Sequence, residues 1–195
     1  MDSRIKYLYN IMPMINISSV IRHGILSNAL ACRIQHSSIA DNTVQNRRDS
    51  VHIPGGKPLH NYANLYFDAR NPMMYRRKEE FNEICVLCVS TEVMKFSGVV
   101  LTDGNASSGY NRFFSVEEGL SAICFDKVFA RDWTYPDTFE YYRRKRIKCA
   151  EVLVPDKIGF EYIKSAFAAT KLAEYKLRGL SWPLPIEINP DIFFM

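Results

Sequence analysis

The sequence predicts one α+β domain, on the basis of three observations. The chain has 195 residues, of which 47% are hydrophobic and 24% charged; at this size one hydrophobic core can bury about 70% of the surface of the unfolded chain. Short runs of strand-forming residues alternate with short helical patterns along the whole length. No repeat, low-complexity tract or linker-like stretch divides the sequence, so we expect a single domain over residues 1–195.

The first predicted elements are a strand and a short helix. Residues 6–12 alternate in the manner of a strand. A helical pattern follows, which Asn16 or Ser18 can cap at its start and Gly24 at its end. Residues 27–58 are polar and rich in turn formers, and we expect a long loop region there, with room for one short helix. Because long loops in compact domains usually bind ligands or cover a site, this region is a candidate binding segment.

The helix best marked in the sequence follows a capping box. Ser115 and Glu118 form that box, and apolar residues recur at helical spacing through residues 116–130, so one continuous helix is predicted. Pro72 marks another helix or turn start, and a further helix is expected over residues 172–180. The remaining strand formers are concentrated in short runs. We expect strands at residues 61–67, 84–90, 150–154, 162–168 and 185–190.

The N-terminal segment lacks the features of a secretory signal. Its apolar run is interrupted by Asn10 and Pro13, and no small-residue cleavage site follows. Nowhere do about 18 uncharged apolar residues occur together, the length that a transmembrane helix requires. The sequence therefore predicts a cytoplasmic protein that does not contact a membrane.

The cysteines predict buried thiols rather than disulfides or a metal site. Their number is five and they are scattered, as is typical of a reducing compartment. Cys85 and Cys88 form a C-x-x-C, but they lie in a run of strand formers, where this spacing directs the two side chains to opposite faces. The histidines offer no pair at zinc-ligand spacing. We therefore expect no bound metal.

Basic residues are concentrated in one short stretch. The formal net charge of the chain is only +4, whereas residues 143–148, RRKRIK, contain five basic residues and no acid, directly after several aromatic residues. Such a mixture binds single-stranded nucleic acid, because cations neutralise phosphates and aromatic faces stack on bases. The alternative is a solvated charge run next to core aromatics. The candidate nucleic-acid contacts are Trp133, Tyr141, Arg143, Arg144, Lys145 and Arg146.

Two further charged positions are candidates for chemistry. Glu151 stands at the start of an apolar strand, just after the basic stretch. It is either an exposed edge residue or a carboxylate that stabilises positive charge developing on a sugar ring. Arg47 and Arg48 are either a basic surface pair or a binding site for a diphosphate.

Five segments, spread in order over nearly the whole chain, carry a family resemblance. They are LYNIMPMINISSVIRHGIL, VQNRRDSV, LHNYANLYFDARNPMMY, VLTDGNAS and RIKCAEVLV, and the combination of LYFDARNPMMY with the downstream RIKCAEVLV is the most specific. Together they resemble the DarT family of DNA ADP-ribosyltransferase toxins. The resemblance implies the ADP-ribosyltransferase fold related to the PARP enzymes, with split antiparallel or mixed β-sheets around an NAD cleft.

The resemblance also implies an activity and partners. We expect a toxin that transfers ADP-ribose from NAD+ to a base of single-stranded DNA and releases nicotinamide. A cognate antitoxin of the macrodomain or NADAR type would remove the modification. The same fold and NAD chemistry would serve a transferase that acts on RNA or protein. A non-catalytic nucleic-acid-binding module, in which Glu151 is a surface residue, is the alternative from another class.

Residue by residue, the resemblance implies a catalytic glutamate at Glu151, preceded by a substrate-recognition loop over residues 131–149. Arg48, with Arg47 as the alternate, corresponds to the arginine that contacts NAD and takes part in catalysis. The usual first-strand pattern I-T-H-x-x-N-L is replaced here by residues 11–17, which lack the Thr and the His. We therefore expect a differently built cleft wall and favour guanine over thymine as the target base. The expected NAD-binding residues are Asn10, Met12, Asn16, Arg47, Arg48 and Tyr66.

Overall fold

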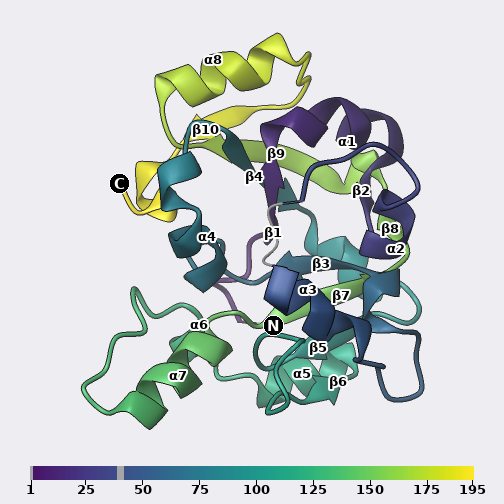
Figure 1. Cartoon of the computed structure of the whole chain (residues 1–195), viewed down its shortest axis with the longest axis vertical. Coiled ribbons are helices and arrows are strands. Elements are labelled where there is room, and N and C mark those ends of the chain that lie inside the picture. Colours follow the sequence, from purple (N-terminus) through teal and green to yellow (C-terminus); the bar gives the residue numbers. More distant parts are fainter. Residues whose placement is uncertain (1, 39–41) are drawn as a thin grey trace.

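The centre of the fold is a mixed β-sheet (Figure 1). The computed structural model describes residues 2–38 and 42–195, and within them eight strands follow the order β10-β9-β4-β1-β3-β7-β5-β6. Neighbouring strands are antiparallel, except for β9 and β10, which are parallel. A separate two-stranded ribbon pairs β2 with β8. The strands are β1 (Leu8–Pro13), β2 (Ile25–Leu26), β3 (Tyr62–Tyr66), β4 (Ile84–Val89), β5 (Val100–Thr102), β6 (Phe113–Phe114), β7 (Glu151–Pro155), β8 (Lys157–Ile158), β9 (Ile163–Ala168) and β10 (Ile186–Ile188).

The sheet nearly separates into two halves between β1 and β3. On one side β1 pairs with β4 through six residue pairs, and on the other β3 pairs with β7 through five. Between β1 and β3, the register within the described residues holds a single pair, Tyr9 with Tyr66. Next to it the Asn10 side chain bridges the gap, because its Nδ2 donates to the carbonyl oxygen of Asn64 at 3.1 Å. This arrangement confirms the expected α+β fold with split sheets.

Short helices surround the sheet (Figure 1). Helix α8 covers the end that carries β10, α1 and α2 lie on the side of β2 and β8, and α4, α6 and α7 lie on the opposite side. Helix α3 lies in front of β3 and β7. The α-helices are α1 (Ile17–His23), α2 (Asn28–Ala31), α3 (Asn42–Asp49), α4 (Pro72–Arg76), α5 (Val116–Ala122), α6 (Phe125–Val128), α7 (Thr138–Ile147) and α8 (Lys171–Gly179).

The two faces of the sheet bury different side chains. On β4, Cys85 and Leu87 enter the larger core cluster, whereas Ile84 and Val86 enter a second cluster on the other face. Cys88 shares the parity of Ile84 and Val86, so Cys85 and Cys88 point to opposite faces, as the sequence predicts. Both thiols are fully buried and free. Within the described ranges, no helix is long and apolar enough to cross a lipid bilayer.

Most element boundaries predicted from the sequence lie within two residues of the observed ones. The Ser115–Glu118 capping box is present with both reciprocal hydrogen bonds. Gly24 ends α1 with a φ of 79°, where a Cβ would lie 2.0 Å from the carbonyl oxygen of Ile158. Asn16 occupies the N-cap of α1, but its side chain does not cap the helix.

The prediction of one continuous helix over residues 116–130 is wrong. The segment contains two helices, α5 and α6, separated at Ile123, whose ψ of 129° is extended. Ile123 and Phe125 both enter the larger core cluster, whereas residues two apart on one helix point to opposite sides. Burial of both side chains therefore outweighs the local helical pattern.

The predicted loop over residues 131–149 is partly helical in the structure. Most of this stretch is α7, and Asp137 caps it by accepting a hydrogen bond from the Glu140 N–H at 2.8 Å. Acidic residues lie at its start and basic residues in its last turn, which suits the helix dipole. The polar region 27–58 contains two helices, α2 and α3, in its described part; residues 39–41 lie outside the described ranges.

We expect iodoacetamide at about pH 8 to modify Cys32 and Cys124 in the folded protein and to spare Cys85, Cys88 and Cys149. The first two are exposed and the other three buried. Burial raises the pKa of Cys85 to about 12 and that of Cys88 to about 11, so neither forms the reactive thiolate. Mass spectrometry of the alkylated protein measures this, with protein unfolded in guanidinium before alkylation as the control. Modification of any of the three buried thiols in folded protein would contradict the structure.

Candidate functional site

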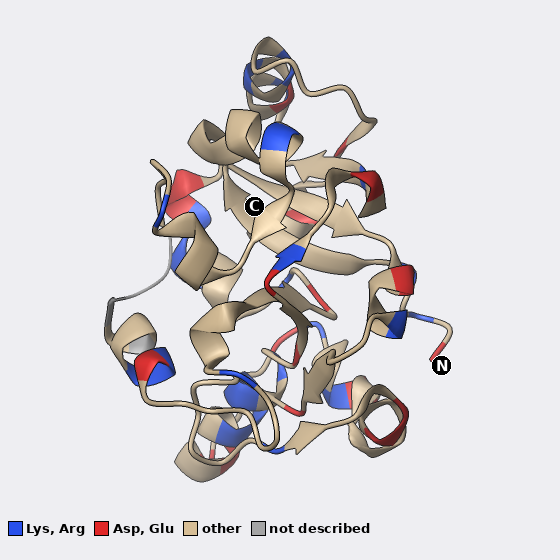
Figure 2. Ribbon diagram, turned by 90° about the vertical axis from the view of Figure 1, so that its right-hand side faces the viewer, with Lys and Arg blue, Asp and Glu red and all other residues tan. Residues whose placement is uncertain are grey.

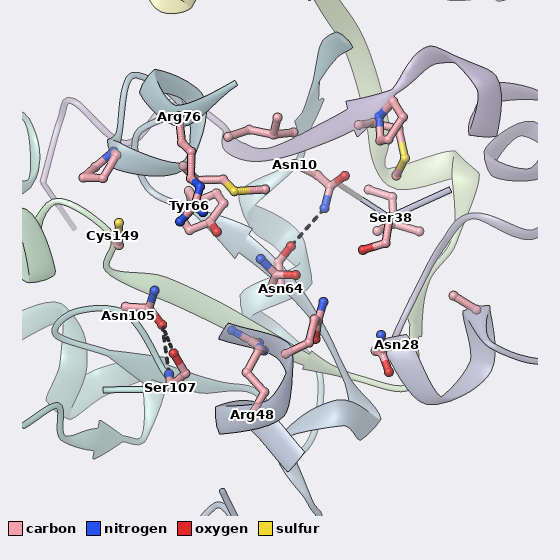
Figure 3. A pocket seen from close by; sticks show the side chains of 18 of the residues that line it. Asn10, Asn28, Ser38, Arg48, Asn64, Tyr66, Arg76, Asn105, Ser107 and Cys149 are labelled. Carbon is pink, nitrogen blue, oxygen red and sulfur yellow. Dashed lines mark hydrogen bonds between the residues drawn. The ribbon is translucent and has the colours of Figure 1, made fainter. Parts of the chain in front are cut away.

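A pocket of about 800 Å³ opens where the sheet splits. Its walls come from segments far apart in the sequence: β1, α2, α3, β3, α4, the loop after β5, and α7. This volume lies within the usual range for sites that bind small molecules and cofactors. Figure 3 shows Arg48 and the Asn105–Ser107 loop on one side of the pocket, Asn10 and Ser38 on the other, and Tyr66 and Asn64 between them.

Glu151 is the first residue of β7, and its carboxylate is completely buried. Its Oε1 accepts a hydrogen bond from the Ala106 N–H at 2.8 Å, and Arg48 Nη1 lies 3.2 Å from its Oε2. The Glu151 N–H in turn donates to Thr102 Oγ1 at 3.2 Å. A buried carboxylate is stable only when it is paired and hydrogen-bonded in this way. The alternative in which Glu151 is a surface residue is therefore wrong.

Arg48 separates Glu151 from the pocket. Its side chain extends from α3 into the pocket (Figure 3) and is 11% exposed. Both of its contacts with Glu151, at 3.2 and 3.4 Å, are longer than the usual 2.7–2.9 Å of a charge-assisted hydrogen bond. The neighbouring Arg47 also lines the pocket, but its Nε donates to the Thr43 carbonyl on its own helix. The structure thus places Arg48, rather than Arg47, beside Glu151.

The opposite wall is formed by Asn10 and Met12 of β1 and by Asn16 of the 3-10 turn that follows it, and all three line the pocket. Asn10 is buried, and its Oδ1 has no hydrogen-bond partner among the described residues. Asn16 uses its whole amide, because its Nδ2 donates to the Ser37 carbonyl at 2.7 Å and its Oδ1 accepts from the Ser37 N–H at 2.9 Å. This pair of bonds fixes the segment after α2 against the turn that follows β1.

Tyr66 forms the back of the pocket at the end of β3. It lies opposite Glu151 in the β3–β7 register and opposite Tyr9 across the split. Burial, and to a lesser extent the nearby Glu151 carboxylate, raises the pKa of Tyr66 well above its usual range. The phenol therefore stays neutral at physiological pH and offers an aromatic ring to a ligand.

The basic stretch of α7 is largely paired with acids. Arg143 and Arg144 both bind Glu140, at 3.0 and 3.1 Å, and Arg146 binds Asp103 at 3.1 Å. Basic and acidic residues are likewise interleaved over most of the ribbon in Figure 2. The local excess of charge in the sequence therefore overstates the free positive charge of the folded helix.

Four of the six candidate nucleic-acid contacts line the pocket: Trp133, Tyr141, Lys145 and Arg146. Trp133 is buried, where its ring packs edge-on against Tyr75 and Phe194. Lys145 lies over the ring of Tyr141, with Nζ 5.6 Å from its centre.

Several residues of the site cannot be predicted from the sequence. The turn at residues 103–105 is recognisable from its D-G-N sequence, but nothing in that pattern indicates that the next residue, Ala106, holds Glu151. Asn105 Oδ1 accepts hydrogen bonds from both the N–H and the hydroxyl of Ser107, which shapes this loop (Figure 3). The contact of Phe194 with Trp133 and Tyr75 joins segments that are distant in sequence, so no local pattern indicates it.

Comparisons with known proteins match nearly the whole chain. The family model described as "ssDNA thymidine ADP-ribosyltransferase, DarT" matches residues 9–194. The chain is 28% identical over its full length to a protein of Thermosipho africanus named "DNA ADP-ribosyl transferase-DNA ADP-ribosyl glycohydrolase fusion protein". It covers 51% of that relative, so the chain spans about half of the relative's length.

Solved structures match the fold over 97% of the chain. The T. africanus DarTG structure in complex with ADP-ribose superimposes with a TM-score of 0.82 at 26% identity, and the chain covers 51% of it. Thermus sp. 2.9 DarT in complex with ADP-ribosylated ssDNA has a TM-score of 0.83 at 23% identity, with 96% of that chain covered. The same Thermus protein in complex with NAD+ has a TM-score of 0.79 at 21% identity, with 98% covered.

The pairing of Glu151 by Arg48 predicts a difference between the two adjacent arginines. We expect Arg48→Met to lower the free energy of unfolding by about 2 kcal/mol, because it leaves a buried carboxylate without its cation. Arg47→Met on the same helix is the matched control and should change it by less than about 0.5 kcal/mol. Adding Glu151→Gln to Arg48→Met should recover most of the loss. Urea unfolding measures all four proteins, and equal losses for the two arginine variants would refute the pairing.

Proposed function

The chain belongs to the DarT family, and from that premise we propose that it transfers ADP-ribose from NAD+ to a base of single-stranded DNA. The observation that carries the proposal is a fully buried carboxylate, Glu151, held behind a single arginine at the wall of an 800 Å³ pocket. Among relatives, the fusion protein is named as a DNA ADP-ribosyl transferase, and the Thermus structures are complexes with NAD+ and with ADP-ribosylated ssDNA.

NAD+ is proposed to occupy the pocket along the split of the sheet. Its diphosphate is assigned to Arg48 and Arg47, whose guanidinium groups suit bidentate phosphate binding. The nicotinamide ring is assigned to the face of Tyr66, which is neutral and lies opposite Glu151 in register. Asn10, Met12 and Asn16 are assigned to the wall facing it, since all three line the pocket.

The proposed reaction breaks the bond between C1″ of the ribose and the nicotinamide nitrogen and forms one between C1″ and a nitrogen of the DNA base. Nicotinamide leaves as a neutral molecule, because the departing electron pair cancels the positive charge of its ring. The Glu151 carboxylate accepts a hydrogen bond from a ribose hydroxyl and stabilises the positive charge that develops on the sugar. The long contacts to Arg48 suit this exchange, since the arginine can turn to the diphosphate while the hydroxyl takes its place.

The attacking base nitrogen must lose its proton as the new bond forms. We assign this proton to Glu151 as well, since its carboxylate is the group that the proposed reaction places beside C1″. Holding NAD+ and the base together in one site supplies much of the remaining acceleration.

The DNA strand is proposed to enter along α7. Lys145 is the cation of the basic stretch that has no carboxylate at ion-pair distance in the described part of the chain. Two aromatic side chains of the same helix, Phe139 and Tyr142, are 77% and 63% exposed and suited to stacking on bases. Tyr141 and Trp133 are assigned to the pocket end of this path, whereas Arg143 and Arg144 reach phosphates by leaving Glu140.

The acceptor base and the partner follow from different observations. The family model is named for thymidine, while the altered first strand is the feature that favours guanine. The fusion relative carries a glycohydrolase name on the same chain as the transferase name. We therefore propose that this chain acts as a toxin whose partner antitoxin hydrolyses the ADP-ribose from DNA.

Glu151→Gln should reduce transfer of labelled ADP-ribose from NAD+ to single-stranded DNA by about 10²–10³-fold, because it removes the charge that stabilises the sugar cation. The amide keeps an oxygen for the Ala106 N–H, so the thermal midpoint should change little. The assay compares DNA, RNA and cell protein as acceptors. Mass spectrometry of the digested nucleosides identifies the modified base, thymidine or guanosine. Transfer at the wild-type rate by the variant, or labelling of RNA or protein in place of DNA, would overturn the proposal.

Lys145→Gln should weaken binding of a single-stranded oligonucleotide and lower the slope of log K against log salt by about 0.7, the contribution of one phosphate contact. Lys171→Gln is the control, since Lys171 is 89% exposed on α8, at the opposite end of the molecule from α7 (Figure 1). Fluorescence anisotropy over a range of salt concentrations measures both variants. Equal slopes for the two would remove Lys145 from the DNA path.

A further inference from the structure

We infer that Arg146 is a positioning residue for Glu151: it docks the loop of residues 102–107 onto α7, so that the Ala106 N–H is fixed as a donor to the carboxylate. The inference rests on the proposed function for its kinetic consequence, while its structural part stands independently. It gives Arg146 a role different from the phosphate contact that its place in the basic stretch suggests.

Arg146 holds the start of the loop through both side chain and backbone. Its Nη1 donates to Asp103 Oδ1 at 3.1 Å, and its carbonyl oxygen accepts from the Asn105 N–H at 3.2 Å. Both partners of the ion pair are largely buried, with side chains 19% and 12% exposed. Burial is the largest single influence on the pKa of Asp103 and raises it. Hydrogen bonds from Arg112 and the charge of Arg146 together outweigh burial, so the pKa lies below its ordinary value. Asp103 is therefore ionised at neutral pH.

Gly104 lets the loop lie directly on the Arg146 side chain. A Cβ at this position would be 2.7 Å from Arg146 Nη1, 2.8 Å from its Cγ and 3.0 Å from its carbonyl oxygen. Real Cβ atoms essentially never approach other atoms below 3.0 Å. The close contact thus requires glycine, and it makes Gly104 an independent position at which the same docking can be disturbed.

The same loop holds Glu151 at two points, Thr102 and Ala106. The Thr102 hydroxyl donates to the Gly104 carbonyl at 2.6 Å and accepts from the Glu151 N–H. The Ala106 N–H donates to Glu151 Oε1 at 2.8 Å, and Thr102, Ala106 and Glu151 are all fully buried. The loop therefore fixes Glu151 at its backbone and at one carboxylate oxygen.

The two carboxylate oxygens of Glu151 have different parts in the proposed reaction. Arg48 and Ala106 are the two groups that contact the carboxylate in the described residues. When Arg48 turns to the diphosphate, the Ala106 N–H remains as the fixed donor, which orients Oε1 and leaves Oε2 for the ribose hydroxyl. A loop released from α7 would leave the carboxylate without a fixed orientation at the moment of reaction, while the residues assigned above to NAD+ and DNA, none of which lies on this loop, stay in place.

The test uses Arg146→Gln, Gly104→Ala, and the variant that combines these two substitutions. We expect each single variant to lower kcat about 10- to 100-fold, as a misplacement of about 1 Å can do, with Kd for NAD+ and the salt slope of DNA binding unchanged. The combined variant should lose no more than the greater of its single variants, because both changes remove the same docking. Arg112→Gln is the matched control, because Arg112 is the other arginine that pairs with Asp103. The Arg112 side chain is 66% exposed and is not among the atoms nearest to Gly104. The kcat of this control should stay within about twofold of wild type.

Amide hydrogen exchange at Ala106 gives a second readout that needs no substrate. Protection of this N–H should fall in Arg146→Gln and Gly104→Ala and persist in Arg112→Gln, with global stability monitored by the exchange of the β4 amides. If the wild-type protein transfers nothing to DNA, the proposed function fails, but loss of Ala106 protection in Arg146→Gln still supports the docking. Unchanged protection, additive losses in kcat, or a reduced salt slope with normal kcat in Arg146→Gln would overturn the inference.

Discussion

The structure is organised around the burial of one carboxylate at the point where the sheet splits. Removing a carboxylate from water costs several kcal/mol unless donors replace the water. For Glu151 these donors come from the loop after β5 and from α3, neither of which is adjacent to β7 in sequence. Helix α3 must therefore lie across β3 and β7 (Figure 1), and the loop must close tightly over the start of β7. The pocket is the space left between these two constraints and the first strand.

The charges of the basic stretch are mostly paired within the fold rather than free at its surface. Of the five cations in residues 143–148, four are paired with carboxylates of other turns or elements, including Lys148, which is buried against Asp68. Ion pairs at the surface contribute little to stability, but the buried ones fix where each element lies. Helix α7 thus has one side that holds the loop of residues 102–107 and another that carries the exposed aromatic side chains Phe139 and Tyr142.

The sequence predicts the strands well because each is a short run of strand formers, and the motif around Glu151 is local. It fails where burial of distant groups decides the outcome. The break between α5 and α6 depends on core space for Ile123 and Phe125, and Asn16 binds Ser37 instead of capping its helix. For Glu151, sequence patterns allow both an exposed edge position and an inward-facing one. The geometry that distinguishes Arg48 from Arg47 arises only when α3 is placed against β7.

Because β1 and β3 share a single residue pair in the described structure, the side chains of β1 that line the pocket, apart from Asn10, are not needed to hold the two halves of the sheet together. Strand β1 is held by its six pairs with β4, so its other edge is free to form the cleft wall without a matching ladder on β3. Most side chains on that wall can therefore change with little penalty to the sheet, while Glu151, inside the second half, cannot. In evolutionary terms, the wall can vary by point mutation while the sheet stays intact.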